Sequence, residues 1–144
     1  MEYLFYLLFA LNILHELPIL LDPSNHIKLM EDIKAKKFTS PEFQDKPLPE
    51  KWPELFSLFW LLGTQLLYFL LTIIGLFSFQ WWAFLVFFCW SVLTGSLMKN
   101  SFNHTLKYAW YRLDALVSLT IIIFVILNAF HFHISFADIL NYIN

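Results

Sequence analysis

Three polar residues near the start of the chain have the spacing of a site on one helix face. Asn12, His15 and Glu16 stand at positions i, i+3 and i+4, which are neighbours on a helix surface. An imidazole beside a carboxylate can exchange a proton, bind a ligand or join an ion pair. The residues around them are mostly apolar, and an ionisable side chain in such a segment is by default either paired or functional.

Two basic residues far along the chain are the expected partners of Glu16. Arg112 and Lys107 precede the last long apolar run, where Asp114 competes for Arg112. We expect a Glu16–Arg112 ion pair that docks two helices on each other. The alternatives are a protonatable or ligand-binding Glu16, and a Glu16 whose side chain reaches the membrane interface.

Long apolar runs predict the elements that position these residues. The chain has 144 residues, of which 59% are hydrophobic and 14% charged, against about 25% charged in average soluble domains. No charged side chain occurs from Leu55 to Met98 or from Ala115 to Ala137. Because a membrane span needs roughly 20 apolar residues, the first run predicts two spans and the second predicts one.

The N-terminal segment is the weakest span, since it contains the three polar residues and Pro18. A cleaved signal peptide would begin with basic residues and end in a small-residue cleavage pattern, and neither feature is found here. We therefore predict an uncleaved helix, with a helix lying in the membrane interface as the alternative.

The predicted fold is all-α: a polytopic membrane protein with four transmembrane helices in an antiparallel bundle and a short amphipathic cytoplasmic helix between the first two. The chain, 1–144, forms a single membrane domain. Its parts are spans at about 3–21, 55–79, 81–98 and 112–132, a cytoplasmic segment at 22–54 and a tail at 133–144.

The cytoplasmic segment is expected to have two parts. Apolar residues at Ile27, Met30 and Ile33 predict an amphipathic helix from Ser24 to Lys37, preceded by an Asp22–Pro23 start signal. Four prolines between Phe38 and Pro53 predict extended chain in the second part.

All nine basic residues lie in two places along the chain. Six lysines stand between the first and second spans, and Lys99, Lys107 and Arg112 stand between the third and fourth. Short loops rich in Lys and Arg stay on the cytoplasmic side, so both termini are predicted on the non-cytoplasmic side.

This topology separates the histidines, because His15, His26 and His104 fall on the inner side and His131 and His133 on the outer side. We expect no metal site and no cofactor. The net charge of −2 predicts no nucleic-acid partner.

Polar side chains concentrate in the predicted cytoplasmic half of the bundle. With a rise of about 1.5 Å per residue, Asn12, Gln65 and Ser91 fall at similar depths. Either they form hydrogen bonds between helices, or they line a polar vestibule open to the cytoplasm. The candidate polar or ligand site comprises Asn12, His15, Glu16, Gln65, Ser91, Thr94, His104, Lys107, Arg112 and Asp114.

Three functions fit these features. The first is a structural or interaction subunit of a membrane assembly, or a self-associating bundle, whose partners are the lipid bilayer and other copies or subunits. The second is an oligomeric channel or transporter with a cytoplasm-facing vestibule. The third, a membrane enzyme acting on a lipid-like substrate at the cytoplasmic interface, is less expected because no catalytic constellation is present.

For an enzyme, the candidate residues near the cytoplasmic interface are His15, Glu16, His104, Tyr108, Tyr111 and Arg112. In its four spans, length, long first cytoplasmic loop and Arg/Tyr cluster, the chain resembles the membrane-associated glutathione-transferase family. That family's Arg, Asn and Glu pattern on the second helix has no counterpart here, where Gln65 is the only strongly polar residue well inside that helix. The resemblance is therefore one of architecture, and membership is not inferred.

Overall fold

A computed structural model describes residues 2–100 and 104–143, with the side chains of 97–100 and 104 excepted. The chain is 88% helical, and no strand occurs in the part that the structure describes. The elements are α1 (Glu2–Leu21), α2 (Ser24–Lys34), the 3-10 turn η1 (Lys37–Thr39), α3 (Pro41–Gln44), α4 (Leu48–Gly75), α5 (Trp81–Asn100), α6 (His104–Leu127), the π-helical turn η2 (Asn128–Phe132) and α7 (Phe136–Ile143).

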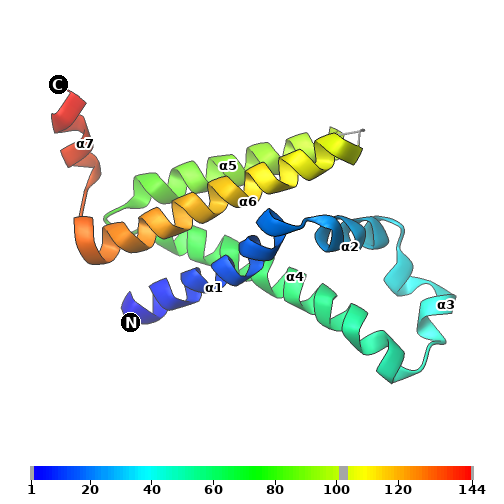
Figure 1. Cartoon of the computed structure of the whole chain (residues 1–144). Helices are drawn as coiled ribbons and strands as arrows, with labels where there is room; N and C mark the ends of the chain where they lie inside the picture. The colour runs from blue at the N-terminus through cyan, green and yellow to red at the C-terminus, as the bar shows by residue number, and fades with distance from the viewer. Residues whose placement is uncertain (1, 101–103, 144) are drawn as a thin grey trace.

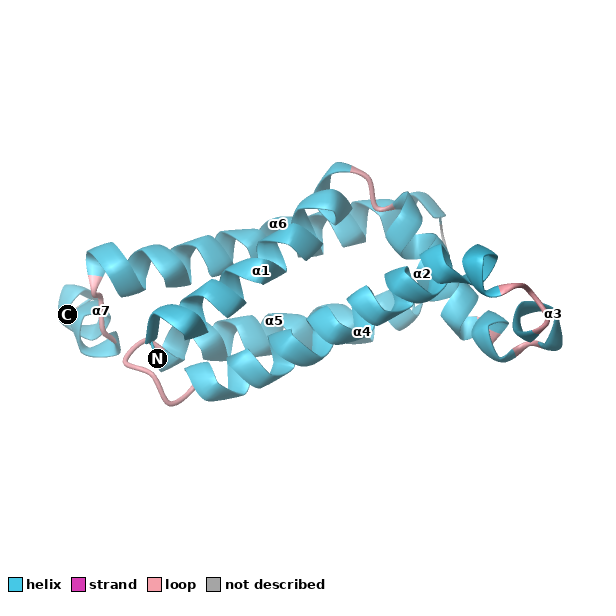
Figure 2. Ribbon diagram, turned by 90° about the horizontal axis from the view of Figure 1, so that it is seen from below, coloured by secondary structure: helices cyan, strands magenta, loops and turns pink. Residues whose placement is uncertain are grey.

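The long helices α1, α4, α5 and α6 lie side by side (Figures 1 and 2). The most extensive contact joins α1 to α6, while α4 also packs on α1 and α5 packs on both α4 and α6. The start of α1 and α7 lie at one end of the bundle, which we call the terminal end (Figure 1). The opposite end carries α2 and α3 and is called the α2 end.

Three helices are long and apolar enough to cross a membrane, namely Glu2–Leu21, Leu48–Gly75 and Thr105–Phe132. In α5, the described residues contribute a shorter apolar stretch, Trp81–Ser96. The predicted all-helical class is confirmed, and the three spans indicate a membrane protein. A fourth crossing, the antiparallel arrangement in the bilayer and the sides of the termini stay predictions.

The prediction of extended chain for the proline-rich segment was wrong. Instead of extended chain, it contains η1, α3 and the first turn of α4, which begins at Leu48. Proline is compatible with a first helical turn, where its missing N–H has no intrahelical partner to lose. Pro41 occupies that position in α3, and the Ser40 hydroxyl caps the helix by accepting from the Phe43 N–H at 3.3 Å.

The predicted amphipathic helix is confirmed in α2, which ends a few residues earlier than expected. The Asp22 carboxylate accepts a hydrogen bond from the Ser24 N–H at 3.0 Å, and this bond holds the pKa of Asp22 below its usual value. Ile27, on the predicted apolar stripe, is buried, and α2 packs against α6. This packing positions α2 across the end of the bundle (Figure 2).

An aromatic core fills the half of the bundle nearest the terminal end. Phe9 of α1 and Phe84 and Phe87 of α5 are completely buried, with ring centroids 5.4 and 5.6 Å apart across the two helices. The remaining members of this core are Tyr6, Leu71, Ala83, Ile122 and Val125.

A hydrogen-bonded network closes the terminal end. Gln80, in the turn before α5, is completely buried and donates to the Tyr6 hydroxyl at 2.9 Å and to the Val125 carbonyl at 3.1 Å. The Asn128 side chain donates to the side-chain oxygen Oε1 of Gln80 at 2.9 Å and exchanges two hydrogen bonds with the backbone of Ile134. Because each buried amide is satisfied within the network, this end is tied together without a charge.

Candidate functional site

The four long helices bring polar side chains together in the middle of the bundle. Trp90 donates from its indole Nε1 to the Asp114 carboxylate at 2.9 Å, and Ser91 donates to the Tyr68 hydroxyl at 3.2 Å. Glu16 of α1 is buried and lies close enough to Asp114 and Tyr68 to interact electrostatically with both. We call this set the interior polar cluster; its members are Glu16, Tyr68, Trp90, Ser91, Thr94, Asp114 and Ser118.

The predicted Glu16–Arg112 ion pair does not form. Among the side chains that the structure describes, Glu16 makes no ion pair, and the Arg112 Nη2 atom donates to the Leu21 carbonyl at 3.1 Å. The reason is that α6 begins at His104 rather than at Arg112, which places Arg112 roughly two turns inside the helix. There its guanidinium meets the end of α1, where carbonyl groups lack helical partners.

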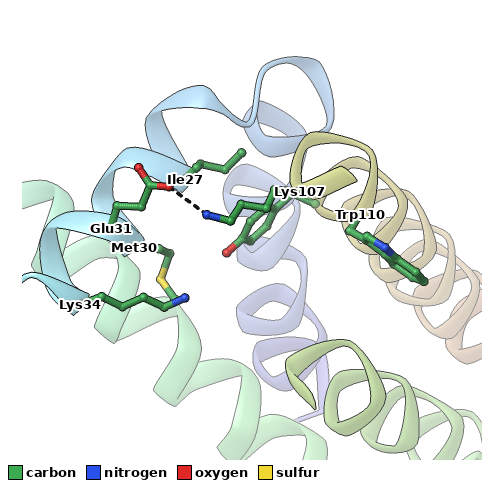
Figure 3. Close-up of a pocket in the computed structure, with 7 residues that line it drawn as sticks. Ile27, Met30, Glu31, Lys34, Lys107 and Trp110 are labelled. Atoms are coloured by element: carbon green, nitrogen blue, oxygen red, sulfur yellow. Dashed lines mark hydrogen bonds and ion pairs between the residues drawn. The ribbon is translucent and has the colours of Figure 1, made fainter. Parts of the chain in front are cut away.

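Lys107, the second expected partner of Glu16, instead joins α2 to α6. Its ammonium lies 3.0 Å from the Glu31 carboxylate (Figure 3). The two residues line a small indentation with Met30 and Lys34, while the Trp110 indole points away from the pair (Figure 3). The enclosed space is about 10 Å³, which is at the lower limit for one water molecule.

The other predicted site residues divide between buried and exposed positions. Asn12 is buried and donates to the Phe9 carbonyl of its own helix at 3.2 Å. Thr94 lies beside Asp114. The side chain of His104 lies outside the described residues.

Gln65 was expected inside the bundle and lies on its exposed surface instead. The buried stripe of α4 passes through Thr64, Tyr68 and Thr72, and a residue next to Thr64 is rotated from it by about 100°. Tyr68 therefore takes the place in the cluster that the depth argument gave to Gln65.

Tyr68, Trp90 and Ser118 are members of the cluster that the candidate site predicted from the sequence did not include. A tryptophan in the middle of an apolar helix, away from a membrane interface, carries an N–H that needs an acceptor when it is buried. That requirement was the available signal for Trp90. Tyr68 is the only tyrosine of α4, and its hydroxyl falls near the middle of the predicted span, away from the interfaces where tyrosine gathers. That position was the available signal for Tyr68.

A separate cavity lies at the α2 end, between α1, α2, η1 and α4, with a volume of about 400 Å³. Its apolar walls come from both long helices, and its polar lining comes mainly from α2 and from the start of α4. We call it the α2-end cavity; its lining residues are Leu14, His15, Pro18, Ile19, Asn25, His26, Lys28, Leu29, Asp32, Lys37, Phe38, Glu54, Phe56, Ser57, Trp60 and Leu61.

Two histidines line this cavity. The His15 Nδ1 atom lies 3.4 Å from the Thr64 hydroxyl, and its buried Nε2 has no hydrogen-bond partner in the described part of the chain. The His26 ring lies between the rings of His15 and Tyr111, at centroid distances of 5.6 and 5.1 Å. Burial, with a smaller contribution from His15, lowers the pKa of His26 to about 4, so this imidazole is neutral at physiological pH.

The charged groups around the cavity neutralise one another. Lys37 lies 3.0 Å from the Asp32 carboxylate and 2.8 Å from that of Glu54, which Lys46 approaches at 3.6 Å. Within residues 2–100 and 104–143, no three His, Cys, Asp or Glu side chains are grouped so that they could hold a metal ion. The chemistry available at this end is thus hydrogen bonding to His15 and to the neutral imidazole of His26 beside an apolar wall.

A scan against protein-family models, a search of curated proteins and a search of solved structures each find no match to this chain.

Proposed function

We propose that this protein is a four-span membrane protein that acts by associating with other helices in the bilayer, and first of all with a second copy of itself. The nine basic residues and the apolar runs between them support the threading. The short turn between α4 and α5 supports a return crossing by α5, which also packs on α6. In this threading the α2 end faces the cytoplasm and the terminal end faces outward.

The single observation that carries self-association is Gln65. Its side chain is exposed on α4, ten residues or about 15 Å beyond Leu55, and the described residues offer it no hydrogen-bond partner. Its neighbours one turn before and after, Leu62 and Phe69, are exposed apolar side chains that would face lipid. At that depth no water is present to satisfy an amide, so a bare glutamine is unfavourable.

A second copy of the chain is the simplest source of a hydrogen-bond partner for the Gln65 amide. Across a two-fold axis, the Gln65 amide of one copy donates to the carbonyl oxygen of the other and accepts the same bond in return. Hydrogen bonds of this kind between membrane helices contribute on average about 0.6 kcal/mol and at most about 1.7. The remaining affinity would come from packing of the apolar side chains beside it.

The test is energy transfer between labelled copies of the pure protein as the lipid-to-protein ratio of vesicles is raised. Replacing Gln65→Leu is expected to weaken association by roughly three- to tenfold. The matched control is Thr120→Val, because Thr120 is also exposed but donates to the Leu116 carbonyl of its own helix at 2.8 Å. A monomeric wild type at every ratio, or equal association of Gln65→Leu, contradicts the proposal.

The topology is tested separately by single-cysteine labelling in a Cys89→Ala background. Lys36→Cys should react with a membrane-impermeant thiol reagent only from the cytoplasmic side, and Asn141→Cys only from the other side. Reaction of both positions from one side would contradict the four-span threading.

The interior of one copy gives less support to permeation. A path along the bundle would have to pass the buried aromatic core and the Gln80–Asn128 network. A channel would therefore have to run between copies, where Gln65 is the polar residue that the exposed face of α4 offers at mid-span. We keep self-association as the proposal because a dimer gives the Gln65 amide its hydrogen bonds and does not require a pore.

A further inference from the structure

We propose that α7 is an interfacial anchor: it lies along the surface of the bilayer at the terminal end, with its apolar face inserted among the lipids. This inference goes beyond self-association. It uses only the crossing of the bilayer by α6, so it holds for either orientation of the bundle.

The sequence of α7 gives the helix one apolar and one polar face. Its large apolar residues follow the i, i+3, i+4, i+7 spacing and are Phe136, Ile139, Leu140 and Ile143. At about 100° per residue they fall on one side of the helix, and Asp138, Asn141 and Tyr142 fall on the other. Such a separation is typical of helices that lie in a membrane interface.

The apolar face of α7 is left largely uncovered by the described part of the chain. No residue of α7 is buried, and Leu140 and Ile143 are 45% and 75% exposed. A capping box starts the helix, since Asp138 accepts from the Ser135 N–H at 2.8 Å and the Ser135 hydroxyl accepts from the Asp138 N–H at 3.4 Å. Isolated helices shorter than roughly 12–15 residues are nevertheless marginal in water. This eight-residue helix therefore needs a further surface to pack on.

The connection between α6 and α7 holds α7 at the end of a span. The candidate span ends at Phe132, and α7 begins at Phe136. The Asn128 side chain fixes the connection by its two hydrogen bonds to the Ile134 backbone. The Phe136 ring then contacts the ring of Trp81, the first residue of α5, at a centroid distance of 5.1 Å. The start of α7 thus lies at the level of the membrane interface, where tryptophan gathers.

The direction of α7 places it along this interface. Figure 1 shows that α7 turns across the direction of α6 instead of continuing it, and His133, with a φ of 56°, lies in the turn. Because Phe136 contacts the bundle, the apolar face is turned toward the bilayer and Asp138 toward water. Hydrogen bonds from Ser135 hold the pKa of Asp138 below its usual value, so this carboxylate is charged and suits the aqueous side.

Lipid fits the apolar face of α7 better than a second protein molecule does. Four partly covered side chains offer less than the roughly 800 Å² that each partner of a stable protein interface buries. The face also adjoins the span of α6, whose apolar exterior meets lipid. Since α7 contains Asp138 and no Lys or Arg, anionic head groups do not attract it. Insertion of apolar side chains, rather than charge, therefore holds α7 at the surface.

The test measures the depth of single nitroxide labels in phosphatidylcholine vesicles, using the full-length protein with Cys89→Ala. Leu140→Cys and Ile143→Cys report on the apolar face, and Asn141→Cys and Tyr142→Cys report on the polar face. Collisions with oxygen, which is enriched in the bilayer, and with a water-soluble nickel complex give each depth. We expect the first two labels roughly 5–10 Å below the head-group boundary and the other two at or above it. Because no residue of α7 is buried, these substitutions leave the bundle intact.

The same labels distinguish the other surroundings that α7 could have. Equal access of the nickel complex to all four labels would show that α7 stays in water, and the proposal would fail. Poor access of both reagents to the labels at Leu140 and Ile143 would show that protein covers the face. Spin–spin broadening would then identify that protein as a second copy of the chain, and the proposal would fail here too.

One substitution tests whether the apolar face is what holds α7 in place. Leu140→Gln should shift a label at Ile143 toward water, whereas the matched change Asn141→Gln, on the polar face, should leave its depth unchanged. Replacing part of the phosphatidylcholine by phosphatidylserine should not draw the labels deeper, because α7 has no basic residue. An unchanged depth in Leu140→Gln, or a deeper position with phosphatidylserine, contradicts anchoring by apolar insertion.

Discussion

Trp90 and Asp114 are joined by a hydrogen bond from the indole Nε1 to a carboxylate oxygen, across 2.9 Å. This bond links α5 to α6 inside the bundle and gives the Asp114 carboxylate a donor in a region without a basic partner among the described residues. A buried acceptor that loses such a donor is left unsatisfied, which costs more than the bond itself contributes.

Replacing Trp90→Phe should lower the free energy of unfolding by about 1–3 kcal/mol, because the buried Asp114 carboxyl group loses its hydrogen-bond donor. Trp60→Phe is the control, since no hydrogen bond of its indole is described. Denaturation by sodium dodecyl sulfate in mixed micelles measures the difference. Adding Asp114→Leu to Trp90→Phe should recover part of the loss, because removing both partners is less unfavourable than removing one. Full additivity of the two changes would contradict this account.

The Gln80 network predicts that replacing the buried Gln80 destabilises the protein more than replacing the exposed Gln65. Gln80→Leu removes hydrogen bonds to Tyr6, Val125 and Asn128, and the free energy of unfolding should fall by about 2–4 kcal/mol. The same substitution at the exposed Gln65, measured where the protein is monomeric, should change it by less than about 0.5 kcal/mol. Equal losses of unfolding free energy at the two positions would contradict the stabilising role of the buried Gln80 network.

Gly75 allows the close approach of α4 to α5. A Cβ atom at this position would overlap the ring of Phe84, which is completely buried. Gly75→Ala should therefore destabilise the protein by about 1–3 kcal/mol. At Gly63 an added Cβ meets nothing within 4 Å, so Gly63→Ala should be neutral or slightly stabilising. Thermal unfolding in detergent distinguishes the two variants. A Gly75→Ala variant as stable as the wild type would contradict the close packing of α4 on Phe84.

The sequence predicted the helices better than it predicted their rotation. Apolar runs and start signals located α1, α2 and α5 to within a few residues, because those patterns act locally. Which face of α4 points inward was not predictable, since lipid and bundle interior are both apolar and leave no contrast along the helix. As a result, the prediction placed Gln65 inside the bundle, whereas the structure has Tyr68 in the interior polar cluster.

The partners of the charged residues were harder still to predict. Glu31 and Lys107 are 76 positions apart and meet only because α2 crosses the end of the bundle and α6 extends beyond the predicted span. The α2-end cavity has the same origin, since it needs α2 and η1 folded back beside α1 and α4. The prediction that His15 belongs to a site at this end was made from helix spacing, but its contact with Thr64 depends on tertiary packing.

The buried imidazole of His26 is expected to make the folded protein less stable in acid. Burial lowers its pKa from 6.5 to about 4, so between these values the unfolded chain binds a proton that the folded chain does not. The free energy of unfolding should therefore fall as the pH falls through this window, by as much as about 3 kcal/mol from this residue. Replacing His26→Gln should remove that part of the acid sensitivity, whereas His131→Gln, at an exposed position, should leave it intact. Unfolding measured in detergent at pH 7 and pH 4.5 tests this, and equal losses in wild type and His26→Gln would mean that His26 is protonated as readily in the folded state as in the unfolded one.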